Sequence, residues 1–120
     1  MELDLNALKL TPSEKIPQVN AIEKLHIING ENIYYTKSIT LATEFLKFYS
    51  NQKFELNTTY KCELILPRNY GIIKFTGEIT EADAEYDNEY TLSYITMTED
   101  DRQTLLYYIY EYSNNETEQE

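Results

Sequence analysis

The sequence predicts a mainly β fold, a small antiparallel β-barrel of roughly five to seven strands that is closed by one amphipathic C-terminal helix. Three observations support this fold class. Residues 60–66, 72–80 and 90–95 alternate between apolar and polar side chains, as half-buried strands do. Asn29-Gly30 separates two further apolar runs, which is a strong hairpin signal. Residues 99–112 place apolar side chains at helical spacing behind a capping residue.

The N-terminal part of the chain predicts an arm followed by a hairpin. Residues 1–20 form the arm, because two prolines interrupt any helix longer than a turn or two. Residues 22–28 and 32–37 are the paired strands of the hairpin, since both residues of Asn29-Gly30 tolerate positive φ at its turn.

Residues 38–49 are open to two interpretations. Leu41, Phe45 and Phe48 lie three or four residues apart, as on one face of a helix, and no helix breaker interrupts them. A strand through Leu41 followed by a helical turn fits the same residues equally well.

Three strands of the second half have a predicted buried face. Gly77 lies on that face without a side chain to pack, which predicts a β-bulge or a close approach of another element. The inward-facing residues of the three strands are Tyr60, Cys62, Leu64, Leu66, Ile73, Phe75, Ile79, Tyr90, Leu92 and Tyr94.

The helix over residues 99–112 begins at a predicted N-cap. The Thr98 hydroxyl can accept a hydrogen bond from the backbone N–H of Asp101, and acidic residues in the first turn favour the positive end of the helix dipole. Arg102 is expected to pair with Glu99 or Asp100. Four residues form the apolar face, namely Leu105, Tyr108, Ile109 and Tyr112. Residues 113–120 are expected to form an acidic disordered tail.

Length and composition predict one domain, residues 21–112, within a chain of 120 residues. The 12 tyrosines and 4 phenylalanines predict an aromatic core. No stretch approaches the roughly 20 apolar residues that a membrane span needs, and the acidic N-terminus does not resemble a signal peptide. A single Cys62 fits a reducing compartment. We therefore expect a cytoplasmic protein without membrane insertion.

Charge is divided unevenly along the chain. Residues 1–74 hold nine basic and eight acidic residues, whereas residues 75–120 hold 13 acidic residues and a single basic one, Arg102. The net charge is −11. Such a surface repels nucleic acid and favours a protein partner with a basic surface, although the same acids also serve solubility alone.

The residues that would support catalysis are few. His26 is the only histidine, and its position in an alternating strand indicates a half-exposed structural residue. Cys62 shares a face with Leu64, which indicates a buried hydrophobic role. The three glycines are isolated and build no phosphate-binding loop. The sequence therefore argues against an enzyme and predicts no cofactor and no metal.

Two groups of residues are candidates for contact with a partner. The first is the acidic loop over residues 81–89. Its alternate acids suggest calcium, but Asn88 and Tyr94 stand where an EF-hand starting at Asp83 needs Gly and Glu, so a solvated loop is the better interpretation. The second group lies off the apolar face of the helix, where Tyr favours interfaces. Together the predicted contact residues are Glu81, Asp83, Glu85, Asp87, Glu89, Tyr107 and Tyr110.

The second half also carries a family resemblance. One strand ends in Leu66-Pro67, the next has a Gly-hydrophobic exit at Gly77, and residues 101–109 read Asp-Arg-x-x-Leu-x-x-Tyr-Ile. This series resembles the PilZ domain family over about residues 54–112. The resemblance implies the PilZ β-barrel with its closing helix.

The nucleotide motifs of that family are altered here. PilZ domains that bind cyclic di-GMP resemble one another in an Arg-x-x-x-Arg arm and an Asp/Asn-x-Ser-x-x-Gly strand. No arginine precedes Arg68, and the nearest counterpart of the strand motif has Thr36 for the acid or amide, retains Ser38, and has Leu41 for the glycine. The resemblance therefore implies a degenerate member that does not bind the nucleotide.

Two functions are compatible with these observations. The first is a non-catalytic adaptor that binds another protein, with a role in bacterial motility, pilus or secretion regulation, as the resemblance implies for degenerate members. The alternative is an acidic DNA-mimic inhibitor of the phage type, in which the acids of residues 78–120 imitate phosphates and block a nucleic-acid-binding protein. Binding that is lost steeply with added salt would favour the mimic.

Overall fold

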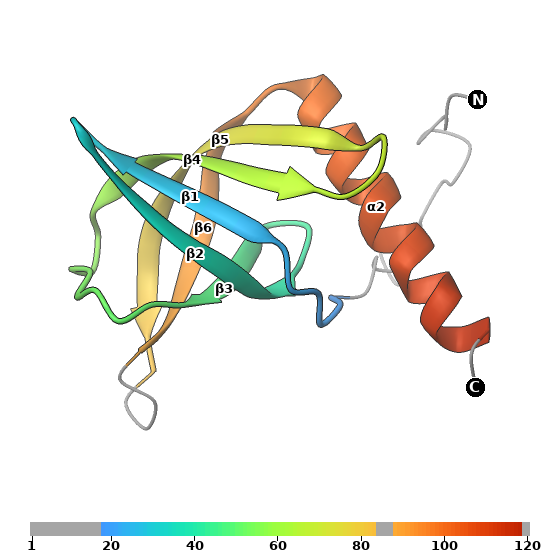
Figure 1. Ribbon diagram of the computed structural model, residues 1–120, viewed down its shortest axis with the longest axis horizontal. Helices are drawn as coiled ribbons and strands as arrows, with labels where there is room; N and C mark the ends of the chain where they lie inside the picture. Colours follow the sequence, from blue (N-terminus) through green and yellow to red (C-terminus); the bar gives the residue numbers. More distant parts are fainter. Residues whose placement is uncertain (1–17, 84–87, 119–120) are drawn as a thin grey trace.

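The computed structural model describes residues 18–83 and 88–118, which form six strands and one helix. The elements are β1 (Lys24–Asn29), β2 (Asn32–Leu41), β3 (Phe45–Tyr49), β4 (Thr59–Leu66), β5 (Gly71–Ala82), β6 (Glu89–Met97) and α2 (Glu99–Glu118). The strands close into a barrel in the order β1-β2-β3-β6-β5-β4, with every pair antiparallel (Figure 1). The predicted fold class is confirmed.

The first hairpin pairs β1 with β2 as predicted, but its turn is shifted by one residue. Asn29 pairs with Asn32, so the two loop residues are Gly30 and Glu31. Gly30 has a φ of 63°, at the first central position where a type II′ turn requires glycine. Asn29 is therefore the last strand residue and not part of the turn.

Residues 38–49 form no helix, so the helical interpretation is wrong, and the alternative is right for the strand through Leu41 but wrong for the helical turn. β2 continues through Leu41, and a second strand, β3, returns at Phe45. β3 pairs with β2 on one side and with β6 on the other, which buries Leu46 and Phe48 completely. The helical spacing of the apolar residues was overridden because this stretch supplies the strand between β2 and β6.

Gly77 lies at a β-bulge between β5 and β6, as predicted. The strand register shifts between Thr76 and Gly77, and a second shift follows between Ile79 and Glu81. A Cβ atom added at Gly77 would lie 2.7 Å from Leu92 Cδ1. Leu92 thus occupies the space that a side chain at position 77 would need.

One continuous core fills the barrel. The inward-facing residues predicted on β4, β5 and β6 belong to this core or pack against it. Phe54 joins an aromatic cluster at the core, where its ring makes edge-to-face contacts with Tyr34, Phe48, Tyr60 and Tyr90. The aromatic core expected from composition is confirmed.

α2 lies across the end of the barrel beside the β4–β5 turn (Figure 1). Its predicted apolar face points into the core, with Leu105, Tyr108 and Ile109 buried and Tyr112 packed against them. Burying one such aliphatic side chain stabilises the fold by about 1.5–3 kcal/mol. The helix therefore closes this mouth of the barrel.

The C-terminal helix is longer than predicted, and the last residues of the predicted arm pack on the barrel. α2 continues to Glu118, so the expected disordered tail from residue 113 is helical over residues 113–118. Residues 1–17 of the expected arm lie outside the described residues, but Val19 is buried and forms a bridge with Leu41. No helix of the described segments has the length and apolar character needed to cross a membrane.

Candidate functional site

The predicted contact residues lie in two separate places. Glu81 and Asp83 are exposed at the end of β5, and Glu89 is half-buried at the start of β6. The backbone N–H of Asp83 donates to the carbonyl of Glu89 at 2.9 Å, so these two residues close the strand pair. Glu85 and Asp87 lie outside the described residues. The expected acidic loop over residues 81–89 is shorter than predicted, because its two ends belong to strands.

Tyr107 and Tyr110 lie on α2, half-buried. The helix is at one side of the barrel, away from the β5–β6 end, which points downward in Figure 1. The structure therefore does not bring the acidic residues and the two tyrosines into one surface.

Tyr107 borders a cleft of about 460 Å³ between α2 and the β4–β5 turn. The ring of Tyr107 meets that of Tyr70 edge-on, with centroids 6.2 Å apart. The Tyr70 hydroxyl donates to the Glu111 carboxylate. Burial, together with this hydrogen bond, raises the pKa of Tyr70 to about 12. Arg68 also lines the cleft, from a turn position with a φ of 58°.

Sequence reasoning did not find this cleft, although it identified the turn that forms one wall. Residues 67–71 read Pro-Arg-Asn-Tyr-Gly, which predicts a turn but not what the turn faces. The contact between Tyr70 and α2 joins residues 37 or more positions apart, and no local pattern encodes it.

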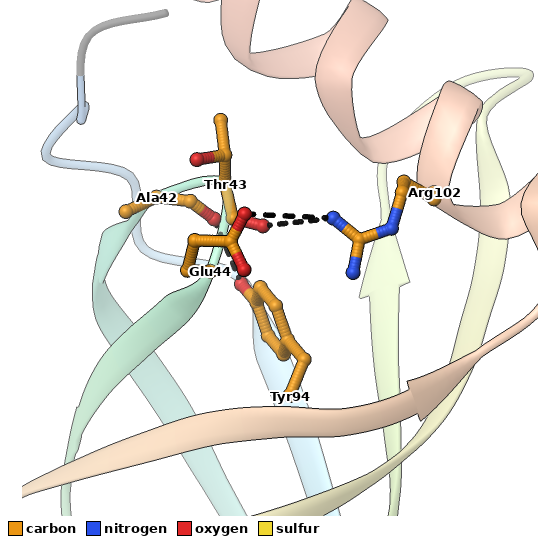
Figure 2. A network of polar contacts seen from close by, with 5 residues as sticks. All are labelled: Ala42, Thr43, Glu44, Tyr94 and Arg102. Carbon is orange, nitrogen blue, oxygen red and sulfur yellow. Dashed lines mark hydrogen bonds and ion pairs between the residues drawn. The ribbon is translucent and has the colours of Figure 1, made fainter. Parts of the chain in front are cut away.

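Polar contacts attach the first half of α2 to the barrel (Figure 2). The Arg102 guanidinium donates to the carbonyl of Thr43 at 3.4 Å and lies 3.9 Å from the Glu44 carboxylate. The prediction that Arg102 pairs with Glu99 or Asp100 is therefore wrong. Beside it, the Tyr94 hydroxyl donates to the carbonyl of Ala42 at 3.1 Å, and burial raises the pKa of Tyr94.

The helix start has the predicted cap and one further contact. The Thr98 hydroxyl accepts from the Asp101 N–H at 3.1 Å, which confirms the N-cap. The Asp101 carboxylate in turn accepts from the backbone N–H of Lys74 on β5, also at 3.1 Å. Because β6 ends opposite Phe75, this helix carboxylate takes the place of a strand partner for Lys74.

Two tyrosines attach the second half of α2 to the segment before β1. The Tyr108 hydroxyl donates to the Glu23 carboxylate, and that of Tyr112 donates to the carbonyl of Asn20 at 3.0 Å. Burial, followed by the bond to Glu23, raises the pKa of Tyr108. Together with the contact of Arg102, these bonds attach α2 between residues 102 and 112, so the outward face of this part is held in one position.

The counterpart of the nucleotide motif lies on β2, where Ser38 is buried. Its hydroxyl donates to the carbonyl of Ala21 at 2.7 Å and accepts from the N–H of Glu23 at 2.9 Å. The Thr36 hydroxyl donates to the carbonyl of Tyr49, and Leu41 is fully buried in the core. Ser38 and Thr36 therefore use their hydroxyls in hydrogen bonds within the protein, and Leu41 packs in the core.

His26 and Cys62 have the structural roles expected of them. His26 is half-buried, stacks edge-to-face on Tyr35 and lies 3.9 Å from the Glu63 carboxylate. Cys62 is buried, and desolvation raises its pKa to about 12, which keeps the thiol protonated. Within residues 18–83 and 88–118, no three metal-ligating side chains come together.

Comparison with known proteins supports the fold. No protein-family model matches the sequence, and no curated protein matches it either. The structure is similar to that of the inhibitor of motility MotI/DgrA from Bacillus subtilis, with a TM-score of 0.72 and 18% sequence identity, covering 82% of this chain and 50% of that one. It is also similar to YcgR from Escherichia coli in complex with c-di-GMP, with a TM-score of 0.73 and 8% identity, over 86% of this chain and 47% of that one.

The isolated PilZ domain of E. coli YcgR gives a TM-score of 0.64 at 6% identity, over 85% of this chain and 95% of that domain. The chain thus spans about half the length of MotI/DgrA and of YcgR, but nearly all of the single domain. The chain has a PilZ-like fold, and the resemblance stated from the sequence is confirmed at the level of the fold.

Proposed function

We propose that this chain is a non-catalytic adaptor of the bacterial cytoplasm that binds another protein and does not bind cyclic di-GMP. The observation that carries the proposal is the position of Ser38. In the nucleotide-binding pattern this serine belongs to the ligand strand, whereas here its hydroxyl is buried between Ala21 and Glu23. A ligand at this position would have to replace two internal hydrogen bonds.

The arginines support the same proposal. A planar guanidinium is the side chain best suited to grip phosphate and stack on guanine. Neither arginine of the chain lies in the N-terminal arm, where the nucleotide-binding pattern has its arginines. Arg68 is in the β4–β5 turn, and Arg102 contacts Glu44 from α2. The net charge of −11 further opposes a dianionic ligand.

The partner surface is proposed to be the outward face of α2, with the acidic β5–β6 end as a second contact. The attachment of α2 at Arg102 and Tyr112, on either side of Tyr107 and Tyr110, pre-organises these two tyrosines, which lowers the entropy cost of ordering them on binding. The acids of residues 75–120 suit a partner with a basic surface. Regulation of motility, a pilus or secretion is the proposed setting.

Calorimetric titration with cyclic di-GMP tests the nucleotide half of the proposal. We expect no binding heat for this chain, while the PilZ domain of E. coli YcgR, which carries c-di-GMP in its structure, serves as the positive control. Saturable micromolar binding by this chain would overturn the proposal.

Affinity capture from lysate of the source cell, at low and high salt, tests the adaptor half. We expect recovery of motility, pilus or secretion components that survive high salt and are lost with Tyr107→Ala or Tyr110→Ala. Tyr35→Ala is the matched control, because Tyr35 is a 72% exposed tyrosine on β2, outside both proposed contacts. Recovery of a nuclease or another DNA-binding protein that is released by salt would support the DNA mimic instead.

A further inference from the structure

The outer face of four neighbouring strands is basic, in contrast to the rest of the molecule. In the barrel, β2, β1, β4 and β5 lie side by side. The register places Lys24 opposite Lys37 and Ile65, and Glu63 opposite both His26 and Lys74. We call this outer surface the sheet face. Its lysines are Lys24, Lys37, Lys61 and Lys74, and its carboxylates are Glu63 and Glu78.

The lysines of the sheet face have no acidic partner within the described residues. The two ion pairs found there are His26 with Glu63 and Arg102 with Glu44. Lys24 and Lys37, both exposed, face each other directly across β1 and β2. Like charges in this position destabilise a sheet, and an approaching carboxylate would relieve the repulsion.

Apolar side chains surround these lysines. Ile22 and Tyr35 are each 72% exposed, and Ile72 is 49% exposed. A hollow of about 490 Å³ lies on the same side of the barrel, with Ile28 and Lys61 in its lining. Exposed apolar groups gathered around unpaired charges are typical of a contact surface.

The outward side of α2 carries the complementary chemistry. Residues spaced by three or four positions form a stripe opposite the buried Leu105 and Ile109. We call this the helix stripe, and its members are Asp100, Gln103, Tyr107, Tyr110 and Asn114. Glu99 and Glu111 flank the stripe. The stripe therefore combines the Asp100 carboxylate with two tyrosine rings, the residue type enriched in binding hot spots.

We infer that a second copy of this chain docks its helix stripe on the sheet face. Each molecule carries both halves of the contact, with charges of opposite sign and apolar groups on both sides. We propose that the stripe docks on the face of the next copy and not reciprocally, which makes the contact heterologous, so that it continues from copy to copy in a ring or an open chain. The inference rests on the α2 surface of the proposed function, and a second copy bound there would compete with the partner for Tyr107 and Tyr110.

Sedimentation velocity of the purified chain over a range of concentrations, at low and high salt, tests the inference without any partner. We expect the mean mass to grow past a dimer with concentration at low salt and to fall to the monomer at high salt. Lys24→Glu/Lys37→Glu reverses the sheet face, and Asp100→Lys/Gln103→Lys reverses the helix stripe. Each variant should associate with itself at least about tenfold more weakly, because two contacts become repulsive.

Mixing the two variants is the decisive step. One variant then presents acids on both surfaces and the other presents bases on both, so the mixture should associate although neither variant does alone. Lys47→Glu/Lys53→Glu is the matched control, with the same charge change outside the sheet face, and should associate like the wild type. Far-UV circular dichroism checks that each variant folds; if the helix variant does not, Gln103→Lys alone takes its place.

Three outcomes would overturn the inference. These are a wild-type monomer at every concentration, an association that stops at two copies, and a mixture that fails to associate. None of them bears on the capture of a partner by Tyr107 and Tyr110, so the failure of self-association is distinguishable from the failure of the proposed function.

Discussion

Ser38 shows how a single hydroxyl ties the segment before β1 to β2. It is 1% exposed and takes part in two hydrogen bonds, one to the carbonyl of Ala21 and one from the N–H of Glu23. The backbone N–H of Ser38 also donates to the carbonyl of Glu23 at 2.8 Å. The removal of such a buried polar group costs most stability when it leaves a hydrogen-bond donor or acceptor without a partner.

We expect Ser38→Ala to lower the free energy of unfolding by about 1–3 kcal/mol, because the carbonyl of Ala21 and the N–H of Glu23 lose their partner. Urea denaturation measures the change. Ser93→Ala is the control, since the Ser93 hydroxyl contacts Thr80 in an exposed position, and its effect should stay within about 0.5 kcal/mol. Equal effects of the two substitutions would contradict this role of Ser38.

Tyr70 predicts a pH dependence of stability. Its pKa is raised from 10.0 to about 12, first by burial and then by the hydrogen bond to Glu111. The folded state therefore holds this proton more tightly than the unfolded state. The resulting stabilisation is complete below pH 10 and is lost as the pH rises through about 12.

When the pH is raised from neutral to about 11, the free energy of unfolding should consequently fall less in Tyr70→Phe than in the wild type. Urea denaturation of both proteins at the two pH values gives the difference, and the neutral-pH pair corrects for the missing hydroxyl. Parallel losses in the two proteins would show that Tyr70 does not contribute to the alkaline transition.

At the level of elements, α2 depends on polar contacts at its start and near its middle. Thr98 caps the first turn, Arg102 reaches the β2–β3 connection, and Tyr112 reaches the segment before β1. The apolar face alone would allow the helix to rotate or slide, whereas these polar contacts select one position.

We expect Thr98→Ala to lower the free energy of unfolding by about 0.5–2 kcal/mol, the usual cost of removing an N-cap hydroxyl. Thr98→Ser keeps the hydroxyl and should cost less than half as much. Chemical denaturation followed by circular dichroism compares the two. The cap would have no role in stability if both variants matched the wild type.

For the whole molecule, the excess of acidic residues dominates the electrostatics. The net charge is −11, and the described residues contain the two ion pairs His26–Glu63 and Arg102–Glu44. Repulsion among the acids therefore opposes folding, and salt should reduce this repulsion more than it weakens attractive pairs.

We expect the melting temperature of a dilute sample to rise by roughly 2–8 °C between low and physiological salt, for about 1 kcal/mol of relieved repulsion. Calorimetry with NaCl and with KCl separates screening from binding of a particular cation. A falling melting temperature would mean that attractive charge contacts prevail.

The sequence by itself determined most of the local structure. Alternation over residues 60–66, 72–80 and 90–95 identified three strands, the hairpin signal identified two more, and Thr98 identified the helix start. These features depend on neighbouring residues, because strand periodicity and capping are properties of a few consecutive positions. The candidate tyrosines of α2 followed from the same helical periodicity.

Only the tertiary structure decided which elements and surfaces meet. Phe45–Tyr49 became a strand because β2 and β6 flank it, and Arg102 turned to Glu44 rather than to its own helix. The cleft at Tyr70, the bond from Tyr108 to Glu23 and the row of lysines on the sheet face join residues distant in sequence. Such contacts arise from strand register and barrel closure, which no local pattern of the sequence specifies.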